Sequence, residues 1–132
     1  MIVFEDVTKD YKGGNHALKH VNLRIRKGDF VFVLGRSGAG KSTFIKLILR
    51  EEQATSGRVL VDGLDLSVMK KRKVPYLRRR MGVVFQDFRL IPTMSVYENV
   101  AFAMRVTNIA EDKIKKRVPY VLGLVGLADK AD

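Results

Sequence analysis

The stretch LGRSGAGKSTF, residues 34–44, leaves this chain fewer possible folds than any other part of its sequence. The spacing G-x-x-x-x-G-K-[ST] is met by Gly35, Gly40, Lys41 and Ser42. The continuous apolar run Phe30–Gly35 before it predicts a central strand buried on both faces, and a helical pattern begins at Lys41. A strand, a glycine loop and a helix in this order predict an anion site made of inward-facing backbone N–H groups.

The residue types of this loop fit a nucleoside triphosphate with its metal ion. We expect Lys41 to reach the β- and γ-phosphates and the Ser42 hydroxyl to take one position around Mg²⁺. The alternative is a glycine turn with a structural role only. A chance match is expected in under about 1% of chains of this length, because glycine is about 7% of residues. The loop therefore predicts binding of ATP with Mg²⁺.

The rest of the chain alternates strand-like and helix-like patterns, which predicts an α/β fold. Further strands are expected at 2–11, 17–25, 58–63 and, as a second buried strand, 81–86. Helices are expected from Lys41, around Val74–Arg80, after Ser95 and near 111–125. Ser95 and Glu98 have the spacing of a capping box. Pro119 lacks a backbone donor and is expected to kink or break the last helix.

Composition and charge narrow the class of protein. With 132 residues the chain fits one domain, and without cysteine it has no disulfide, zinc–thiolate site or thiol chemistry. The apolar stretch 120–128 is too short to span a membrane, and the first residues do not resemble a secretory signal. The net charge of +11 is concentrated in clusters at 70–73, 78–80 and 113–117. One interpretation is that these clusters bind an acidic partner such as phosphate, nucleic acid or anionic lipid. We favour the other interpretation, that they are solvated helix faces, because few aromatic residues lie among them to stack bases.

Phosphoryl transfer also needs a carboxylate that holds the metal ion. Asp62 is the one candidate ahead of the C-terminal helices, because it follows the apolar residues of RVLV. An Asp-Gly pair after alternating residues is first of all a hairpin turn, and we favour that interpretation for Asp62.

The motifs GRSGAGKST, SGRVLVDG and MGVVFQDFRLIP together resemble the ATP-binding subunits of ABC transporters, over essentially the whole chain. The stretches FIKLILREE, VPYLRRRMGVVFQDFRL and YENVAFAM look most like those of the cell-division members. The resemblance implies a P-loop NTPase fold of the ABC type, truncated within its helical subdomain. Residues 1–87 would be the strand-rich core with the phosphate loop, and residues 88–132 the start of the helical subdomain.

The resemblance also implies roles for individual residues. Tyr11 would stack on adenine, whereas without the resemblance we would interpret it as an ordinary tyrosine at the end of a strand. Gln86 would approach the metal ion and the attacking water, whereas without the resemblance we would interpret it as a solvated polar residue that ends a buried strand. Lys41 and Gln86 would be the catalytic residues, and Ser42 and Gln86 the metal ligands. The amide cradle would comprise Ser37, Gly38, Ala39, Gly40, Lys41, Ser42 and Thr43, with Thr43 a further phosphate ligand.

The sequence departs from this family in what it lacks. It contains no LSGGQ-type signature, no apolar strand ending in Asp-Glu and no switch histidine, since His16 and His20 precede the phosphate loop. We therefore expect this chain to correspond to the N-terminal part of such a domain and to hydrolyse ATP negligibly by itself. A non-hydrolysing ATP-dependent regulator is the alternative, and the coding DNA past Asp132 separates the two.

The family resemblance implies partners as well. An integral membrane subunit would be contacted near Gln86–Pro92, and the full-length protein would form a head-to-tail homodimer, peripheral on the cytoplasmic face of the bacterial inner membrane. The implied function is coupling of MgATP binding and hydrolysis to a membrane partner that regulates cell-wall hydrolysis at the division site. Alternatives are an ATP-binding subunit for lipoprotein release or export and, from another class, a basic nucleic-acid-binding module. We expect no specific nucleic-acid partner.

Overall fold

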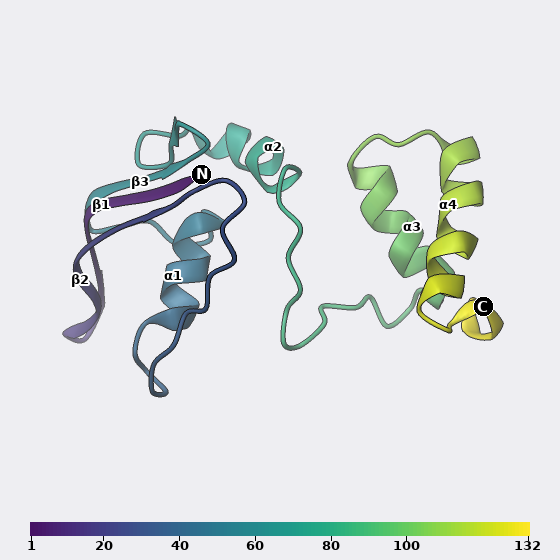
Figure 1. Ribbon diagram of the computed structural model, residues 1–132, viewed down its shortest axis with the longest axis horizontal. Helices are drawn as coiled ribbons and strands as arrows, with labels where there is room; N and C mark the ends of the chain where they lie inside the picture. Colours follow the sequence, from purple (N-terminus) through teal and green to yellow (C-terminus); the bar gives the residue numbers. More distant parts are fainter. The chain divides into compact units, whose positions relative to one another are not determined.

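The computed structural model describes residues 1–132, which divide into two units. Unit 1 is Met1–Met81 and unit 2 is Gly82–Asp132. Unit 1 contains the sheet and helix α1, and unit 2 contains helices α3 and α4 (Figure 1). The division at residue 87 that the family resemblance implies stays a prediction.

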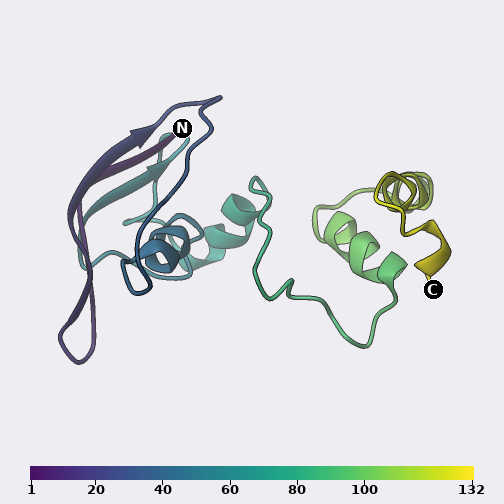
Figure 2. The ribbon, with the colours of Figure 1, turned by 60° about the horizontal axis from the view of Figure 1, so that its bottom comes forward.

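Unit 1 is built on an antiparallel sheet with the strand order β2-β1-β3-β4. The strands are β1 (Ile2–Tyr11), β2 (Asn15–Ile25), β3 (Ser56–Val61) and β4 (Leu64–Asp65). The glycine pair Gly13-Gly14 has positive φ angles and turns β1 back into β2, so that Tyr11 pairs with Asn15. The strands expected at 2–11, 17–25 and 58–63 are confirmed. Figure 2 shows the long strands curving past α1.

Helix α1 (Lys41–Ile48) covers this sheet with its apolar face. Phe44, Leu47 and Ile48 are buried, and the Phe44 ring stacks on that of Phe4 in β1 with centroids 4.7 Å apart. The other buried members of this core are Val7, Val59, Val61, Leu66 and Leu77. Leu77 comes from α2 (Val74–Arg78), which follows the 3-10 turn η1 (Lys71–Lys73).

Unit 2 is a pair of packed helices. Helices α3 (Val96–Val106) and α4 (Glu111–Leu124) bury Ala101, Ile114, Val118 and Leu122, and a 3-10 turn, η2 (Ala128–Lys130), follows. The Ser95 hydroxyl accepts the Glu98 N–H at 3.2 Å, which confirms the predicted N-cap. The Glu98 carboxylate accepts from Arg105 at 2.6 Å, and Arg105 also donates to Glu111 at 2.8 Å.

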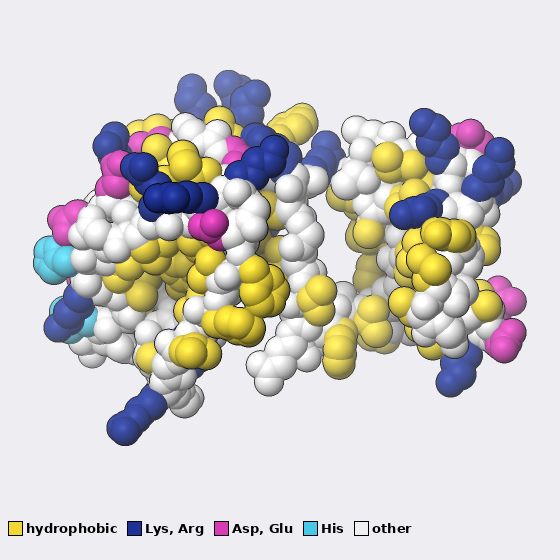
Figure 3. All heavy atoms as spheres, in the orientation of Figure 1, with side chains coloured by type: hydrophobic (Ala, Val, Ile, Leu, Met, Phe, Trp, Pro, Cys, Tyr) yellow, Lys and Arg dark blue, Asp and Glu magenta, His cyan; other side chains and the backbone are white.

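The two strands expected to be buried, 30–35 and 81–86, are not strands in this structure, and both predictions are wrong. The Phe30 and Leu34 side chains are each 86% exposed, and that of Val84 is 94% exposed. The cause is pairing: all four strands bond only to one another, and neither segment hydrogen-bonds into the sheet. Figure 3 shows hydrophobic side chains on the surface of unit 1.

The sequence predicts a kink or a break of the last helix at Pro119; the helix does not break, because α4 continues from Glu111 to Leu124 with Pro119 inside it, and the kink stays a prediction. Proline removes one backbone hydrogen bond, but Ile114, Val118 and Leu122 recur at four-residue intervals and are buried against α3. That packing holds the helix together across the proline. No helix of the structure has the length and apolar character needed to cross a bilayer.

Two isoleucines of α1 test the importance of its buried face. Ile48 is 7% exposed and Ile45 is 43% exposed on the same helix. We expect Ile48→Ala to lower the free energy of unfolding by about 2–5 kcal/mol, because it leaves a cavity in the core. Ile45→Ala removes the same atoms and should cost less than about 1 kcal/mol. Urea unfolding followed by circular dichroism measures both, and equal losses would contradict this packing.

Candidate functional site

The glycine loop ends at the N-terminus of α1, where backbone N–H groups lack partners within the helix. Gly40 is the N-cap residue, with φ 86° and ψ 2°, and no side chain caps the helix. The first turn carries no acidic residue. Helix hydrogen bonding begins with the Phe44 N–H to the Gly40 carbonyl, at 2.8 Å. Neither a side-chain cap nor an acidic residue of the first turn therefore neutralises the positive end of the helix dipole, which favours an anionic ligand.

Lys41 closes the loop on itself. Its Nζ donates to the Gly35 carbonyl at 2.6 Å and to the Arg36 carbonyl at 2.8 Å. The Ala39 N–H donates to the same Arg36 carbonyl at 3.1 Å, which completes a tight turn. An ammonium group has three N–H donors. No carboxylate pairs with Lys41 in the described chain, so its charge is available for an anion.

The loop borders a cavity of about 350 Å³. Its lining residues are Tyr11, Asn15, Ala17, Ser37, Gly38, Gly40, Lys41, Ser42 and Thr43. The Tyr11 hydroxyl lies 3.3 Å from the Oγ1 of Thr43, which is 8% exposed, so this contact joins the end of β1 to the first turn of α1. Most of the predicted cradle thus lines one cavity together with Tyr11, while Gly35 and Ala39 belong to the loop without lining it.

The sequence interpretation missed Asn15 and Ala17, which line the cavity from the start of β2. The signal was present in the turn at Gly13-Gly14. A tight turn there pairs Tyr11 with Asn15, which brings the start of β2 to the same end of the sheet as Tyr11.

Gly40 is required for two separate reasons. Its φ of 86° lies in the left-handed region, which costs other residues roughly 1–2 kcal/mol. A Cβ at this position would also overlap the Ala17 carbonyl oxygen and the Leu18 side chain. Gly38 has φ 80°, but nothing lies near the position of an added Cβ. The loop therefore touches β2 at Gly40 and is open to solvent at Gly38.

The groups around the cavity fit a triphosphate with a hard divalent cation. Main-chain N–H groups and Lys41 supply donors for phosphate oxygens, and the exposed Ser42 hydroxyl is an oxygen ligand of the kind that Mg²⁺ accepts. The chain has no cluster of three or more His, Asp or Glu residues that could hold a metal ion by itself. Gln86 is an exposed residue of unit 2, and its role as a metal ligand and catalytic residue stays a prediction.

Asp62 serves the hairpin between β3 and β4. Its carboxylate accepts from the Met1 ammonium at 2.6 Å and from Arg80 at 3.1 Å. These bonds, the first above all, hold the pKa of Asp62 below its usual range. With φ 48°, Asp62 is a turn residue, as expected. The two histidines are also on the surface, with His16 Nδ1 2.6 Å from Asp10 and His20 Nδ1 2.8 Å from Asp6.

Comparison with known proteins gives a consistent result. Residues 18–132 match the ABC transporter family. The chain is 50% identical over 131 residues to the cell division ATP-binding protein FtsE of Bacillus subtilis, covering 99% of this chain and 58% of that protein. It is 45% identical to the methionine import ATP-binding protein MetN of Helicobacter pylori, covering 98% of this chain and 40% of that protein.

A solved structure supports the same family. A dimeric post-hydrolysis state of the ATP-binding cassette MJ0796, bound to ADP and Pi, is similar with a TM-score of 0.88 and 34% sequence identity. That comparison covers 99% of this chain and 60% of the other. The chain thus spans somewhat more than half the length of the FtsE and cassette proteins it matches.

Two glycine substitutions test the loop geometry without a ligand. Gly38→Ala should lower the stability by about 1 kcal/mol, or Tm by about 4–8 °C, through its positive φ alone. Gly40→Ala should lower Tm at least about twice as much, because it must also displace β2 at Ala17. Thermal unfolding followed by circular dichroism measures both. A smaller effect for Gly40→Ala would show that the loop does not rest on β2.

Proposed function

This chain belongs to the ABC transporter family, and we propose that it is the N-terminal part of the ATP-binding subunit of a bacterial cell-division complex. The observation that carries the proposal is the N-terminus of α1, which has no side-chain cap and begins with Lys41, in a chain 50% identical to an FtsE protein. In this proposal the loop binds the phosphates of MgATP, Lys41 contacts the β- and γ-phosphates, and Ser42 is a ligand of Mg²⁺. Tyr11 stacks on the adenine ring, which would share the tyrosine ring with Lys9, whose Nζ lies 4.9 Å from the centroid.

Lys41 keeps one donor for a ligand while it holds the loop. Its Nζ holds two loop carbonyls at 2.6 and 2.8 Å, and the third N–H is the one available to a phosphate oxygen. These two bonds hold the loop in a closed turn, so we expect little loop ordering to accompany binding.

The complete protein is proposed to work as a pair of subunits on a membrane partner. The MJ0796 cassette is described as dimeric, which supports a homodimer for the full-length form of this protein, and we propose that its two subunits lie head to tail. We propose an integral membrane subunit of the FtsX type as the partner, contacted near Gln86–Pro92, at the cytoplasmic face of the inner membrane. ATP binding and hydrolysis would then be transmitted through the Gln86 segment to regulate cell-wall hydrolysis.

A transport task is the second candidate, because the chain is also 45% identical to a methionine import protein, MetN. The phosphate site would be the same in both cases, and only the membrane partner would differ. The membrane subunit encoded beside this chain separates the candidates.

Thermal shift with MgATP tests the phosphate site. At about one hundred times its dissociation constant MgATP should stabilise the chain by roughly 2.7 kcal/mol. Lys41→Ala should abolish this stabilisation, because it removes the cation beside the phosphates. Lys46→Ala is the matched control, since Lys46 is an exposed residue at the other end of α1. A flat titration of the unaltered chain, or equal losses in the two variants, would contradict the proposal.

Phosphate release tests the catalytic part. We expect this chain alone to hydrolyse ATP no faster than its Lys41→Ala variant, because it carries no Asp-Glu strand and no LSGGQ segment. A coupled assay for free phosphate under saturating MgATP measures the rate. Steady turnover by the chain that the Lys41→Ala change removes would show that other residues supply these roles.

A further inference from the structure

The segment 70–80 carries an unusual concentration of positive charge. It contains seven cations and no carboxylate; the cations are Lys70, Lys71, Arg72, Lys73, Arg78, Arg79 and Arg80. All of them lie in unit 1, on η1 and α2 or next to these elements. Figure 3 shows Lys and Arg side chains along the upper part of this unit, over the region of β3 and α2. The proposed phosphate site uses none of these residues.

Two of the seven cations are engaged inside the unit. Arg78 donates through Nε to the Leu49 carbonyl at 2.9 Å and through Nη2 to the Arg50 carbonyl at 3.3 Å, at the C-terminus of α1. Arg80 pairs with Asp62 at 3.1 Å. The remaining five form what we call the cationic surface: Lys70, Lys71, Arg72, Lys73 and Arg79, all exposed.

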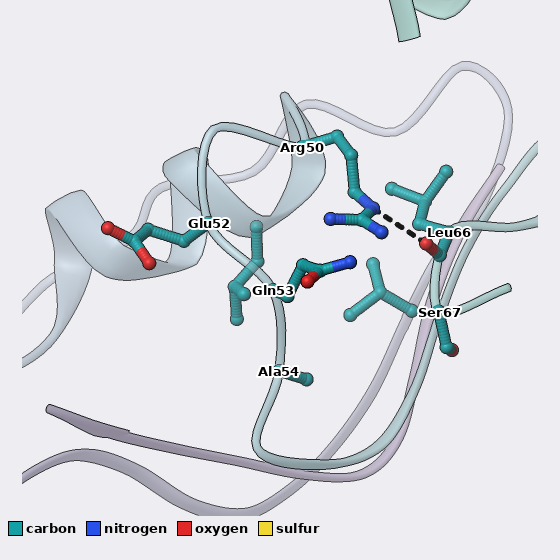
Figure 4. A pocket seen from close by; sticks show the side chains of 8 residues that line it. Arg50, Glu52, Gln53, Ala54, Leu66 and Ser67 are labelled. Atoms are coloured by element: carbon teal, nitrogen blue, oxygen red, sulfur yellow. Dashed lines mark hydrogen bonds between the residues drawn. The ribbon is translucent and has the colours of Figure 1, made fainter. Parts of the chain in front are cut away.

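The backbone on the other side of this surface is also held in place. Arg50 donates through Nε to the Leu66 carbonyl at 2.7 Å and through Nη2 to the Met69 carbonyl at 3.5 Å. Figure 4 shows its guanidinium directed across the hollow between the end of α1 and Leu66. Arg50 fixes the chain just before Lys70, and Arg78 fixes it just after Tyr76. The cationic surface is therefore presented on an anchored segment.

Exposed apolar groups lie among these cations. Tyr76 is 61% exposed, with Lys73 Nζ 5.7 Å and Arg79 Cζ 5.3 Å from its ring centroid. Val68 is 79% exposed two residues before Lys70. Cations around an aromatic ring and an aliphatic side chain are the combination that favours the interface of an anionic bilayer, where ammonium and guanidinium groups meet phosphates and the ring enters the headgroup layer. We propose that the cationic surface binds the headgroups of anionic lipids.

The same residues fit a nucleic acid less well. Binding of unpaired bases relies on open aromatic faces, and binding of a duplex on a row of cations that follows two strands. Tyr76 is the one aromatic residue in the segment 70–80, and two cations already lie over its ring. A base that stacked there would share the ring with these two cations. The surface is short, because its five cations all lie within residues 70–79.

Vesicle co-sedimentation of the purified chain tests the proposal. Vesicles of phosphatidylcholine with phosphatidylglycerol should bind the chain, and vesicles of phosphatidylcholine alone should not. Raising the salt from about 0.1 to about 1 M shortens the Debye length from about 10 to about 3 Å and should release it. The triple variant Lys70→Gln, Lys71→Gln, Lys73→Gln should bind about a hundredfold more weakly, at roughly fivefold per cation removed.

The matched control is the triple variant Lys113→Gln, Lys115→Gln, Lys116→Gln, which removes the same charge from exposed positions of α4 and should bind as the unaltered chain does. Circular dichroism of both variants checks that they fold alike. Three results would overturn the proposal. The chain could bind neutral and anionic vesicles equally, or the two triple variants could lose vesicle binding equally. The chain could also bind a single-stranded RNA oligonucleotide more tightly than anionic vesicles, with the Lys70 triple variant losing that RNA binding. The last would assign the surface to nucleic acid. This inference is independent of the proposed ATP site, whose test uses Lys41.

Discussion

The burial of one face of α1 against β1 and β3 fixes where the end of the phosphate loop lies, from Gly40 to Thr43. Phe44 stacks on Phe4, and Leu47 and Ile48 fill the core beneath the sheet, so the helix has one position relative to the strands. That position brings Gly40 against the Ala17 carbonyl and Thr43 within 3.3 Å of the Tyr11 hydroxyl. The unpaired amides of the first turn consequently face a cavity that the ends of β1 and β2 help to form. A shift of α1 would separate the amides from these strand ends.

Much of the fold follows from short-range patterns in the sequence. Strands β1 and β2 alternate apolar and polar residues around a glycine turn, and α1 follows a loop whose spacing is tied to phosphate chemistry. The prediction failed where an apolar run requires a partner that the run itself does not specify. Phe30–Gly35 and 81–86 have the composition of buried strands, but a strand exists only where neighbours accept its N–H and C=O groups. The four paired strands of this chain include neither segment.

The site was predictable to a similar extent and for similar reasons. Lys41, Ser42 and Gly40 are adjacent in sequence, so their joint presence at one helix N-terminus is a local property. Asn15 and Ala17 come to the cavity through strand register, which the turn at Gly13-Gly14 fixes only once the pairing is known. Pro119 is a case in which local sequence misleads. Proline disfavours a helix interior, but the burial of Ile114, Val118 and Leu122 outweighs that preference and α4 continues through it.

Charge is arranged along α1 in the direction that a helix dipole favours. Eight residues make a helix about 12 Å long, with partial positive charge at Gly40 and partial negative charge at its last carbonyls. Arg78 satisfies carbonyls at that C-terminal end, and the cationic surface is anchored to the chain there, where positive charge stabilises the helix. The N-terminal end keeps its amides and Lys41 for an anion. The same helix thus separates the proposed phosphate site from the proposed lipid-binding surface, so that phosphates of the nucleotide and phosphates of a bilayer need not compete for the same cations.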